Sequence, residues 1–176
     1  MSPCLTNGQP GVDSGRGPRQ VPNQDYVHAS AVAIKEAAVL IRGQSGAGKS
    51  SLALALIAAA ENAGFFARLI GDDRINLENH GGRLIARGHP LILGRIERRG
   101  QGILEIPFLA AAVVGLVIDL DPPDQLAARY PEPDRDRIRL SGVSLPFIRL
   151  NQDSAASDLA LTVLQLFHSG SKSSQI

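Results

Sequence analysis

A chain of 176 residues, 44% of them hydrophobic, can bury one sizeable core, so we expect a single domain. The 18 Lys and Arg residues nearly balance the 17 Asp and Glu residues, which argues against nucleic acid or an anionic membrane as an electrostatic partner. The single cysteine, Cys4, excludes an internal disulfide framework and fits a reducing cytoplasm. The longest apolar run, residues 108–118, is shorter than the roughly 20 residues that span a bilayer, so we expect a soluble, cytoplasmic protein.

The two ends of the chain differ in composition from its middle. Residues 1–24 and 169–176 are rich in small and polar residues and poor in large apolar ones. Such segments cannot offset the entropy of ordering, so we expect a disordered arm at 1–24 and a disordered tail at 169–176. Residues 25–168 are then the folded domain.

The folded part is expected to begin with two strands and a helix. Residues 26–34 and 37–43 are short apolar runs separated by Lys35 and Glu36, which predicts two strands joined by a tight turn. A glycine-rich segment follows them. Residues 50–62 have apolar residues at helical spacing, and Gly64 can serve as the left-handed cap of this helix.

Strands are expected to dominate the rest of the chain. Residues 65–71 predict a buried strand, and residues 74–78 and 83–88 flank an Asn-His-Gly-Gly turn, which indicates a hairpin. Residues 103–106 and 113–120 predict further strands, and residues 153–168 predict an amphipathic helix. Together these elements indicate an α/β fold, a central sheet with flanking helices.

The segment 43–50 reads Gly-Gln-Ser-Gly-Ala-Gly-Lys-Ser, between a predicted strand and a predicted helix. In this context Gly-x-x-x-x-Gly-Lys-Ser folds its backbone N–H groups around a polyphosphate, the lysine adds a positive charge, and the serine can coordinate Mg²⁺. The helix N-terminus also favours an anion. The alternative is a glycine-rich turn that binds nothing. We expect a nucleotide or related phosphate compound at Gly43, Gln44, Ser45, Gly46, Ala47, Gly48, Lys49, Ser50 and Ser51.

Other polar residues are candidates for chemistry, each with a structural alternative. Asp72 and Asp73 stand at the carboxyl end of a predicted strand, where open α/β sheets place their ligands; they could accept a proton or bind metal, or simply cap a turn. His28 is a lone histidine at the start of a strand, and Glu97 lies in a polar, glycine-rich segment that could be a solvated turn. Arg129 by itself would be an ordinary surface arginine. The other three histidines have no metal-ligand spacing.

Taken in order, the segments HASAVAI, GQSGAGKSS, LIGDDRINL and RIERRGQGILEI resemble the catalytic domain of the HPr kinase/phosphorylase family, over roughly residues 26–130. The resemblance implies a P-loop-containing core similar to the phosphoenolpyruvate carboxykinase-like fold, and a short form, known in some proteobacteria, that lacks the family's separate N-terminal domain. It also implies phosphorylation of a serine of the phosphocarrier protein HPr with ATP and Mg²⁺, and a homo-oligomer, typically a hexamer.

The resemblance also implies roles for individual residues. Asp73, the second acid of the pair, would accept the proton of the serine hydroxyl, with Asp72 as the second choice. A normal aspartate pKa of about 3.9 makes a poor base, so Asp73 would benefit from burial beside Asp72; the alternative is that Asp73 only orients the serine hydroxyl. Because a protein substrate must reach the loop, we expect an open cleft. The remaining matched positions are Lys49 and His28, both catalytic; Arg129, an active-site arginine; and Ser50 and Glu97, ligands of Mg²⁺.

Two stretches are compared with the family pattern. The signature Glu-x-Arg-Gly-x-Gly-hydrophobic keeps its charges and glycines here as ERRGQGI, residues 97–103. The other stretch departs from the pattern. The Pro-x-Arg-Pro-Gly-Arg segment that the family links to phosphorolysis appears here only as LPFIRLNQ, which keeps Pro146 and a displaced Arg149. We therefore expect phosphorolysis to be weak. Two other hypotheses stay open: a regulatory module that senses ATP without transferring phosphate, and a P-loop kinase of a small metabolite, for which we would expect a lid rich in arginine.

Overall fold

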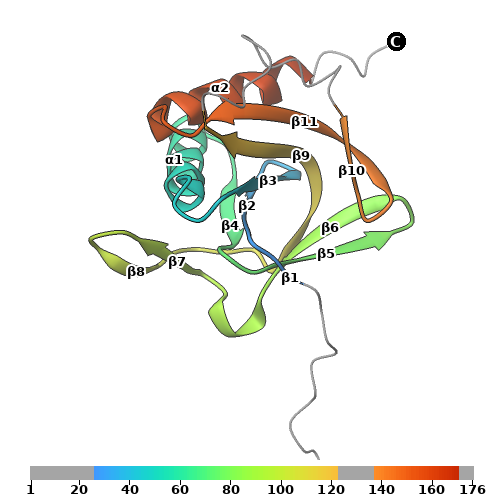
Figure 1. Ribbon diagram of the computed structural model, residues 1–176, viewed down its shortest axis with the longest axis horizontal. Coiled ribbons are helices and arrows are strands. Elements are labelled where there is room, and N and C mark those ends of the chain that lie inside the picture. The colour runs from blue at the N-terminus through green and yellow to red at the C-terminus, as the bar shows by residue number, and fades with distance from the viewer. Residues whose placement is uncertain (1–25, 123–136, 171–176) are drawn as a thin grey trace, which may run out of the picture.

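The structure, a computed structural model, describes residues 26–122 and 137–170 (Figure 1). The predicted arm at 1–24, the predicted active-site residue Arg129 and the last residues of the predicted tail, 171–176, lie outside the described residues. Within the described part, neither α-helix has the length and hydropathy needed to cross a membrane.

A curled sheet of nine strands forms the centre of the molecule (Figure 1). Its main path runs β1-β5-β6-β9-β3-β2-β4, and β11 joins it on β9 and carries β10 at its other edge. The strands β3, β9 and β11 are mutually parallel, whereas the other pairs of this sheet are antiparallel. The strands are β1 (Tyr26–Val27), β2 (Ala29–Ile34), β3 (Ala37–Gly43), β4 (Ala67–Gly71), β5 (Ile75–His80), β6 (Arg83–Gly88), β9 (Ala111–Asp121), β10 (Arg137–Leu140) and β11 (Val143–Asn151).

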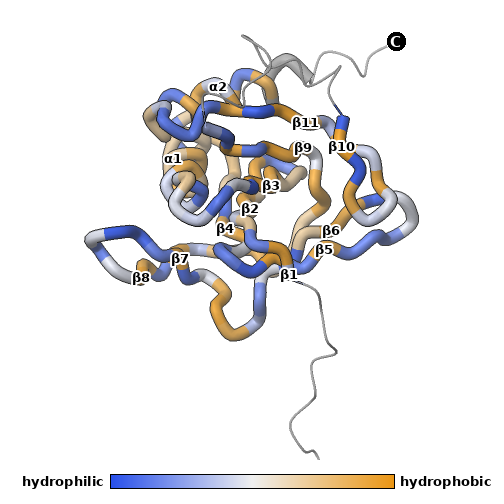
Figure 2. Tube along the Cα trace, viewed as in Figure 1, coloured by the Kyte–Doolittle hydropathy of each residue, from blue (hydrophilic) through white to orange (hydrophobic). Residues whose placement is uncertain are grey.

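A separate two-stranded hairpin, β7 (Arg95–Arg98) and β8 (Gly102–Glu105), extends from the sheet below α1 in Figure 1. Its tip bends at Gly100 and Gly102, whose φ angles of 78° and 85° are values that glycine adopts at little energetic cost. A short 3₁₀ helix, η1 (Pro90–Ile92), precedes the hairpin and forms part of an apolar loop (Figure 2).

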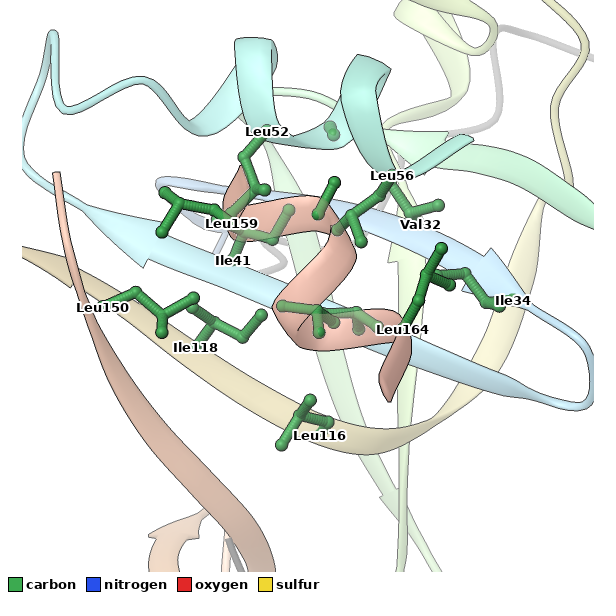
Figure 3. Packing of buried hydrophobic residues seen from close by; sticks show 14 of the residues in the cluster. Val32, Ile34, Ile41, Leu52, Leu56, Leu116, Ile118, Leu150, Leu159 and Leu164 are labelled. Carbon is green, nitrogen blue, oxygen red and sulfur yellow. The ribbon is translucent and has the colours of Figure 1, made fainter. Parts of the chain in front are cut away.

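Two helices, α1 (Lys49–Asn62) and α2 (Ala156–Gly170), pack against each other and cover one face of the sheet. Leu52 and Leu56 of α1 and Leu159 and Leu164 of α2 meet apolar side chains of β2, β3, β9 and β11 in this core (Figure 3). The other face forms a second core, in which the central strands pack against residues of β5, β6, β10 and β11. The sheet thus curls over its own second face, and both described helices lie on the first.

The topology brings several chain segments to one edge of the sheet. Because β3 and β4 are both antiparallel to β2, their carboxyl ends lie beside the start of β2. The register pairs Ala29 with Arg42 and Ala31 with Gly71. His28, the loop after β3 and the Asp72-Asp73 pair after β4 therefore gather at the same edge.

Most predicted elements are confirmed, with shifts at their ends. The strand at 37–43, the helix at 50–62, the hairpin around residues 80–82 and the helix at 153–168 all occur. The predicted strand at 26–34 is divided at His28 into β1 and β2, which pair with different strands. The C-terminal helix continues to Gly170, two residues past its predicted end. The sequence analysis missed β10, β11 and β7, and the segment around Glu97, which had a solvated turn as its alternative, is the strand β7.

Candidate active site

The glycine-rich loop connects β3 directly to α1 and needs glycine at defined points. Gly46 and Gly48 have φ angles of 86° and 92°, which are strained for any residue with a side chain. At Gly43, φ is 151°, and a Cβ atom would lie only 3.0 Å from the carbonyl oxygen of Leu120. The loop therefore closes tightly against β9, and Gly48 stands at the N-cap of α1.

Lys49 begins α1 and is 5% exposed. Its ammonium group donates to the carbonyl oxygens of Gly43, at 3.1 Å, and Gln44, at 3.0 Å. Burial lowers the pKa of Lys49 from its ordinary value, while the charges of Asp73 and Asp72 oppose this shift. The lysine is thus held by the loop, close to two carboxylates.

The two neighbouring aspartates occupy different environments. Asp72 is 3% exposed, whereas the side chain of Asp73 is 53% exposed. Asp73 has a φ angle of 62°, and the N–H of Arg74 donates to the carbonyl oxygen of Asp72 at 2.8 Å, so the chain turns sharply there. The burial beside Asp72 that would favour a base is therefore not found at Asp73, because this turn directs its carboxylate outward and leaves Asp72 as the buried member of the pair.

Asp72 connects three parts of the site through hydrogen bonds. The hydroxyl of Ser30 donates to its Oδ1, and the hydroxyl of Ser50 lies 3.1 Å from Oδ1 and 2.9 Å from Oδ2. The backbone N–H of Glu97 donates to Oδ2 at 3.4 Å. The carboxylate thereby links β2, the first turn of α1 and the hairpin β7–β8.

Asp73 pairs with the predicted histidine. The Nε2 atom of His28 lies 3.1 Å from Oδ1 of Asp73, and both side chains are about half exposed. The contact holds the carboxylate at the cavity wall and leaves its second oxygen, Oδ2, outside this contact. In a pair of this kind, the histidine can orient a carboxylate that accepts a proton.

A cavity of about 390 Å³ opens beside the loop. The hairpin β7–β8 closes one side of it, and a Cβ atom at Gly46 would lie 3.1 Å from Nη2 of Arg99, so this arginine reaches over the loop. The cavity is lined by His28, Ser45, Gly46, Gly48, Lys49, Ser50, Ser51, Asp73, Glu97, Arg98 and Arg99.

The site offers oxygen donors suited to Mg²⁺, although not a self-sufficient metal cage. Within the described residues, no group of three or more His, Cys, Asp or Glu side chains could hold a metal ion. Ser50 and Glu97 both line the cavity, and Mg²⁺ commonly uses one or two protein oxygens while nucleotide phosphates and water supply the rest. The residues therefore fit a metal that arrives with a nucleotide.

The structure brings most of the predicted site residues together. The carbonyl oxygen of Gln44 accepts a hydrogen bond from Lys49, and Gly43 and Ala47 pack within the loop. The other loop residues line the cavity together with His28, Asp73 and Glu97. Arg149 lies elsewhere: it forms an ion pair of 3.6 Å with Asp121 and stacks on Phe147.

Three residues of the site were missed in the sequence analysis. Arg98 and Arg99 line the cavity from the hairpin, and they were treated only as charges of a family signature. Ser30 was not singled out, because a serine inside an apolar strand is an ordinary occurrence. Its spacing of two residues from His28 was the available signal, since such residues lie on the same face of an extended chain.

Comparisons with known proteins show which family this chain resembles in sequence. The model of the HPr Serine kinase C-terminal domain matches residues 19–121. HPr kinase/phosphorylase of Mycoplasma mycoides is 47% identical over 79 residues, which cover 45% of this chain and 23% of that protein. The enzyme of the same name from Clostridium beijerinckii is 35% identical over 83 residues, covering 47% of this chain and 26% of that protein. The match thus spans about a quarter of the length of these relatives.

Among solved structures, that of the HPr(Ser) kinase/phosphatase from Coxiella burnetii has a TM-score of 0.70 with this chain. The superposition covers 84% of this chain and 99% of that one, at 24% sequence identity. At this identity the likeness establishes the fold: a mixed α/β arrangement with a curled central sheet and few helices.

Proposed function

Because the chain belongs to the HPr serine kinase family, whose C-terminal domain it matches over residues 19–121, we propose that it is a protein-serine kinase dependent on ATP and Mg²⁺. Its acceptor is a serine of an HPr-like phosphocarrier, and its role is the regulation of the phosphotransferase system. Residues 25–168 are the catalytic domain, and its last helix continues to Gly170. The protein works in the cytoplasm as a homo-oligomer, a hexamer by family resemblance, without nucleic acid or membrane partners.

One observation carries this proposal: Asp73 and the glycine-rich loop line the same cavity. A nucleotide that binds the loop presents its terminal phosphate near Lys49 and Ser50, and Asp73 lines the same cavity with an accessible carboxylate. A proton acceptor next to a phosphate site is the arrangement that phosphoryl transfer to a hydroxyl requires.

The residues divide the work of transfer as follows. The backbone N–H groups of the loop and the ammonium group of Lys49 stabilise the charge of the transferring phosphoryl group. Asp73 accepts the proton of the serine hydroxyl. At the same time the serine oxygen bonds to the phosphorus, and the bond between the phosphorus and ADP breaks. His28 orients Asp73 for this step. Ser50 and Glu97 hold Mg²⁺, which supplies charge neutralisation on the phosphates when it is bound.

The exposure of the two aspartates supports Asp73 as the base and Asp72 as its scaffold. An acceptor protein can approach a side chain that is 53% exposed, whereas Asp72 is 3% exposed and already receives hydrogen bonds from Ser30 and Ser50. Arg129 remains a proposed active-site arginine on family resemblance alone.

The hairpin arginines favour a second candidate function, a kinase of a small metabolite. Arg99 reaches over Gly46, as an arginine of a closing lid would. A third candidate, an ATP-sensing regulatory module, would need the nucleotide site but no proton acceptor.

The test is to incubate the protein with labelled ATP, Mg²⁺ and the HPr-like proteins of the same organism. We expect label on one acceptor and phosphoserine in its mass spectrum. Nucleotide binding without transfer to any of these proteins would favour the sensor, and transfer to a small-molecule fraction would favour the metabolite kinase.

We expect phosphorolysis to be slow compared with phosphorylation. Inorganic phosphate would need an arginine that grips it with two parallel hydrogen bonds, and Arg149 is engaged with Asp121 away from the cavity. The measurement is the release of pyrophosphate from seryl-phosphorylated acceptor, enzyme, Mg²⁺ and millimolar phosphate. Release as fast as the forward reaction would contradict this prediction. It would indicate that Arg98 or Arg99, which line the cavity, binds the inorganic phosphate.

A further inference from the structure

Ser30 lies in the interior of β2 and is the one polar residue of that strand. The strand reads Ala-Ser-Ala-Val-Ala-Ile, all six residues are buried, and Ser30 itself is 0% exposed. A hydroxyl buried so completely costs free energy unless it forms a hydrogen bond, and an alanine would pack in this strand without that cost. A reason specific to the hydroxyl is therefore needed.

The hydroxyl of Ser30 donates to Oδ1 of Asp72, which is 3% exposed. Two more donors, the hydroxyl of Ser50 and the backbone N–H of Glu97, reach the same carboxylate. Asp72 is absent from the cavity wall, while Ser50 and Glu97 are on it. Asp72 therefore acts on the cavity through the groups that it orients.

The orientation of Ser50 is what this network controls. A serine hydroxyl has one proton to donate and two lone pairs to offer. When its proton is directed to Asp72, the lone pairs of Ser50 stay free for a cation on the cavity side. Ser30 fixes Asp72 from behind, on the side of the sheet, so the carboxylate is held in a position that accepts the proton of Ser50.

We propose that Ser30 is a positioning residue: through Asp72 it orients the hydroxyl of Ser50 for the Mg²⁺ of a metal–nucleotide complex. This inference rests on the proposed nucleotide site and deepens it. His28 and Ser30, two residues apart, thus hold the two neighbouring acids in their separate roles, His28 at Asp73 and Ser30 at Asp72.

The experiment measures how strongly Mg²⁺ enhances nucleotide binding, by calorimetry with a non-hydrolysable ATP analogue in EDTA and in Mg²⁺. In Ser30→Ala, we expect affinity in EDTA to stay within about twofold of wild type, and the enhancement by Mg²⁺ to fall by about tenfold, the typical cost of losing a group that orients a metal ligand. Ser30→Thr, which restores a hydroxyl, should recover the enhancement.

The matched control is Ser144→Ala, which removes an exposed serine of β11 that accepts a hydrogen bond from Arg137. Its Mg²⁺ enhancement should equal that of wild type. In a Ser50→Ala background, Ser30→Ala should produce no further loss, because the two residues act through the same contact.

Two results would overturn the inference. One is a folded Ser30→Ala protein with the wild-type enhancement by Mg²⁺. The other is an equal loss of affinity in EDTA and in Mg²⁺, which would assign Ser30 a structural role only. Because binding and not transfer is measured, a protein that binds the Mg²⁺ complex normally yet phosphorylates no HPr-like acceptor would contradict the proposed function and leave the role of Ser30 in place.

Discussion

Replacing Lys49 with alanine should reduce phosphoryl transfer by at least about 100-fold, the usual cost of removing one group that stabilises transition-state charge. Among the described residues, the ammonium group of Lys49 is the one lysine charge that lines the cavity, and two loop carbonyls hold it in place. Lys49 is 5% exposed, and this burial, which lowers its pKa, shields the group from water, so that its field acts more strongly. The measurement is the single-turnover rate with labelled ATP.

The fold should survive this change. The backbone hydrogen bonds from Ala47 to Gln44 and from Leu52 to Gly48 do not involve the lysine side chain, so the loop and the first turn of α1 keep their main-chain contacts. Lys49→Met, which retains most of the apolar stem, separates loss of charge from loss of packing. A well-folded Lys49→Ala protein with near-normal transfer would remove the loop from the mechanism.

Lys35→Ala is the matched control for Lys49→Ala. Lys35 lies in the turn between β2 and β3, at the opposite end of β3 from the loop, where its ammonium group stacks on Phe65. This variant loses a lysine charge of the described domain without touching the cavity, so transfer should be unchanged. A comparable loss of activity in both variants would point to a general effect of charge.

The sequence predicted the loop and its neighbours well because their signals are local. The glycines at 43, 46 and 48 are required by backbone angles that only glycine adopts easily, and a helix follows directly. The pattern in the sequence and the conformation therefore correspond residue by residue. The helix at 50–62 and its cap at Gly64 are likewise determined by residues that are neighbours in the sequence.

The roles of the two aspartates could not be separated in the same way. Asp72 and Asp73 are chemically identical, and what distinguishes them is a turn with positive φ at Asp73 together with partners from β2, α1 and β7. These partners are distant in sequence. Burial, which would favour a base, is found at Asp72 and not at Asp73, the proposed base.

The missed strand β11 has a physical explanation. Pro146 lies inside it and has no N–H to donate, which argues against a central strand on sequence grounds. In the structure, β11 pairs with β9 only from Phe147 onward, so the proline stands just before this ladder and faces the short edge strand β10. The strand could be recognised only once the position of β9 was known.

Replacing Asp73 with asparagine should abolish serine phosphorylation while nucleotide affinity stays within a few-fold of wild type. Asparagine tolerates the positive φ of 62° at this position and keeps an oxygen that can face His28, so the turn and the contact persist. An amide cannot accept the proton of the serine hydroxyl. The expected loss, about 100-fold or more, is typical of removing a positioned base.

Asp72→Asn is the matched control for this change, because it alters the neighbouring acid by the same atoms. Its amide nitrogen replaces one of the two acceptor oxygens, so the hydrogen bonds made at that oxygen, from Ser30 at Oδ1 or from the N–H of Glu97 at Oδ2, are lost. We therefore expect a lower melting temperature and, because the contact with Ser50 is also weakened, a weaker enhancement of nucleotide binding by Mg²⁺. Asp73→Asn should leave both quantities unchanged. If Asp73→Asn retains transfer and Asp72→Asn loses it with the fold intact, the proton acceptor is Asp72, and the exposed carboxylate beside His28 serves another purpose, such as contact with the acceptor protein.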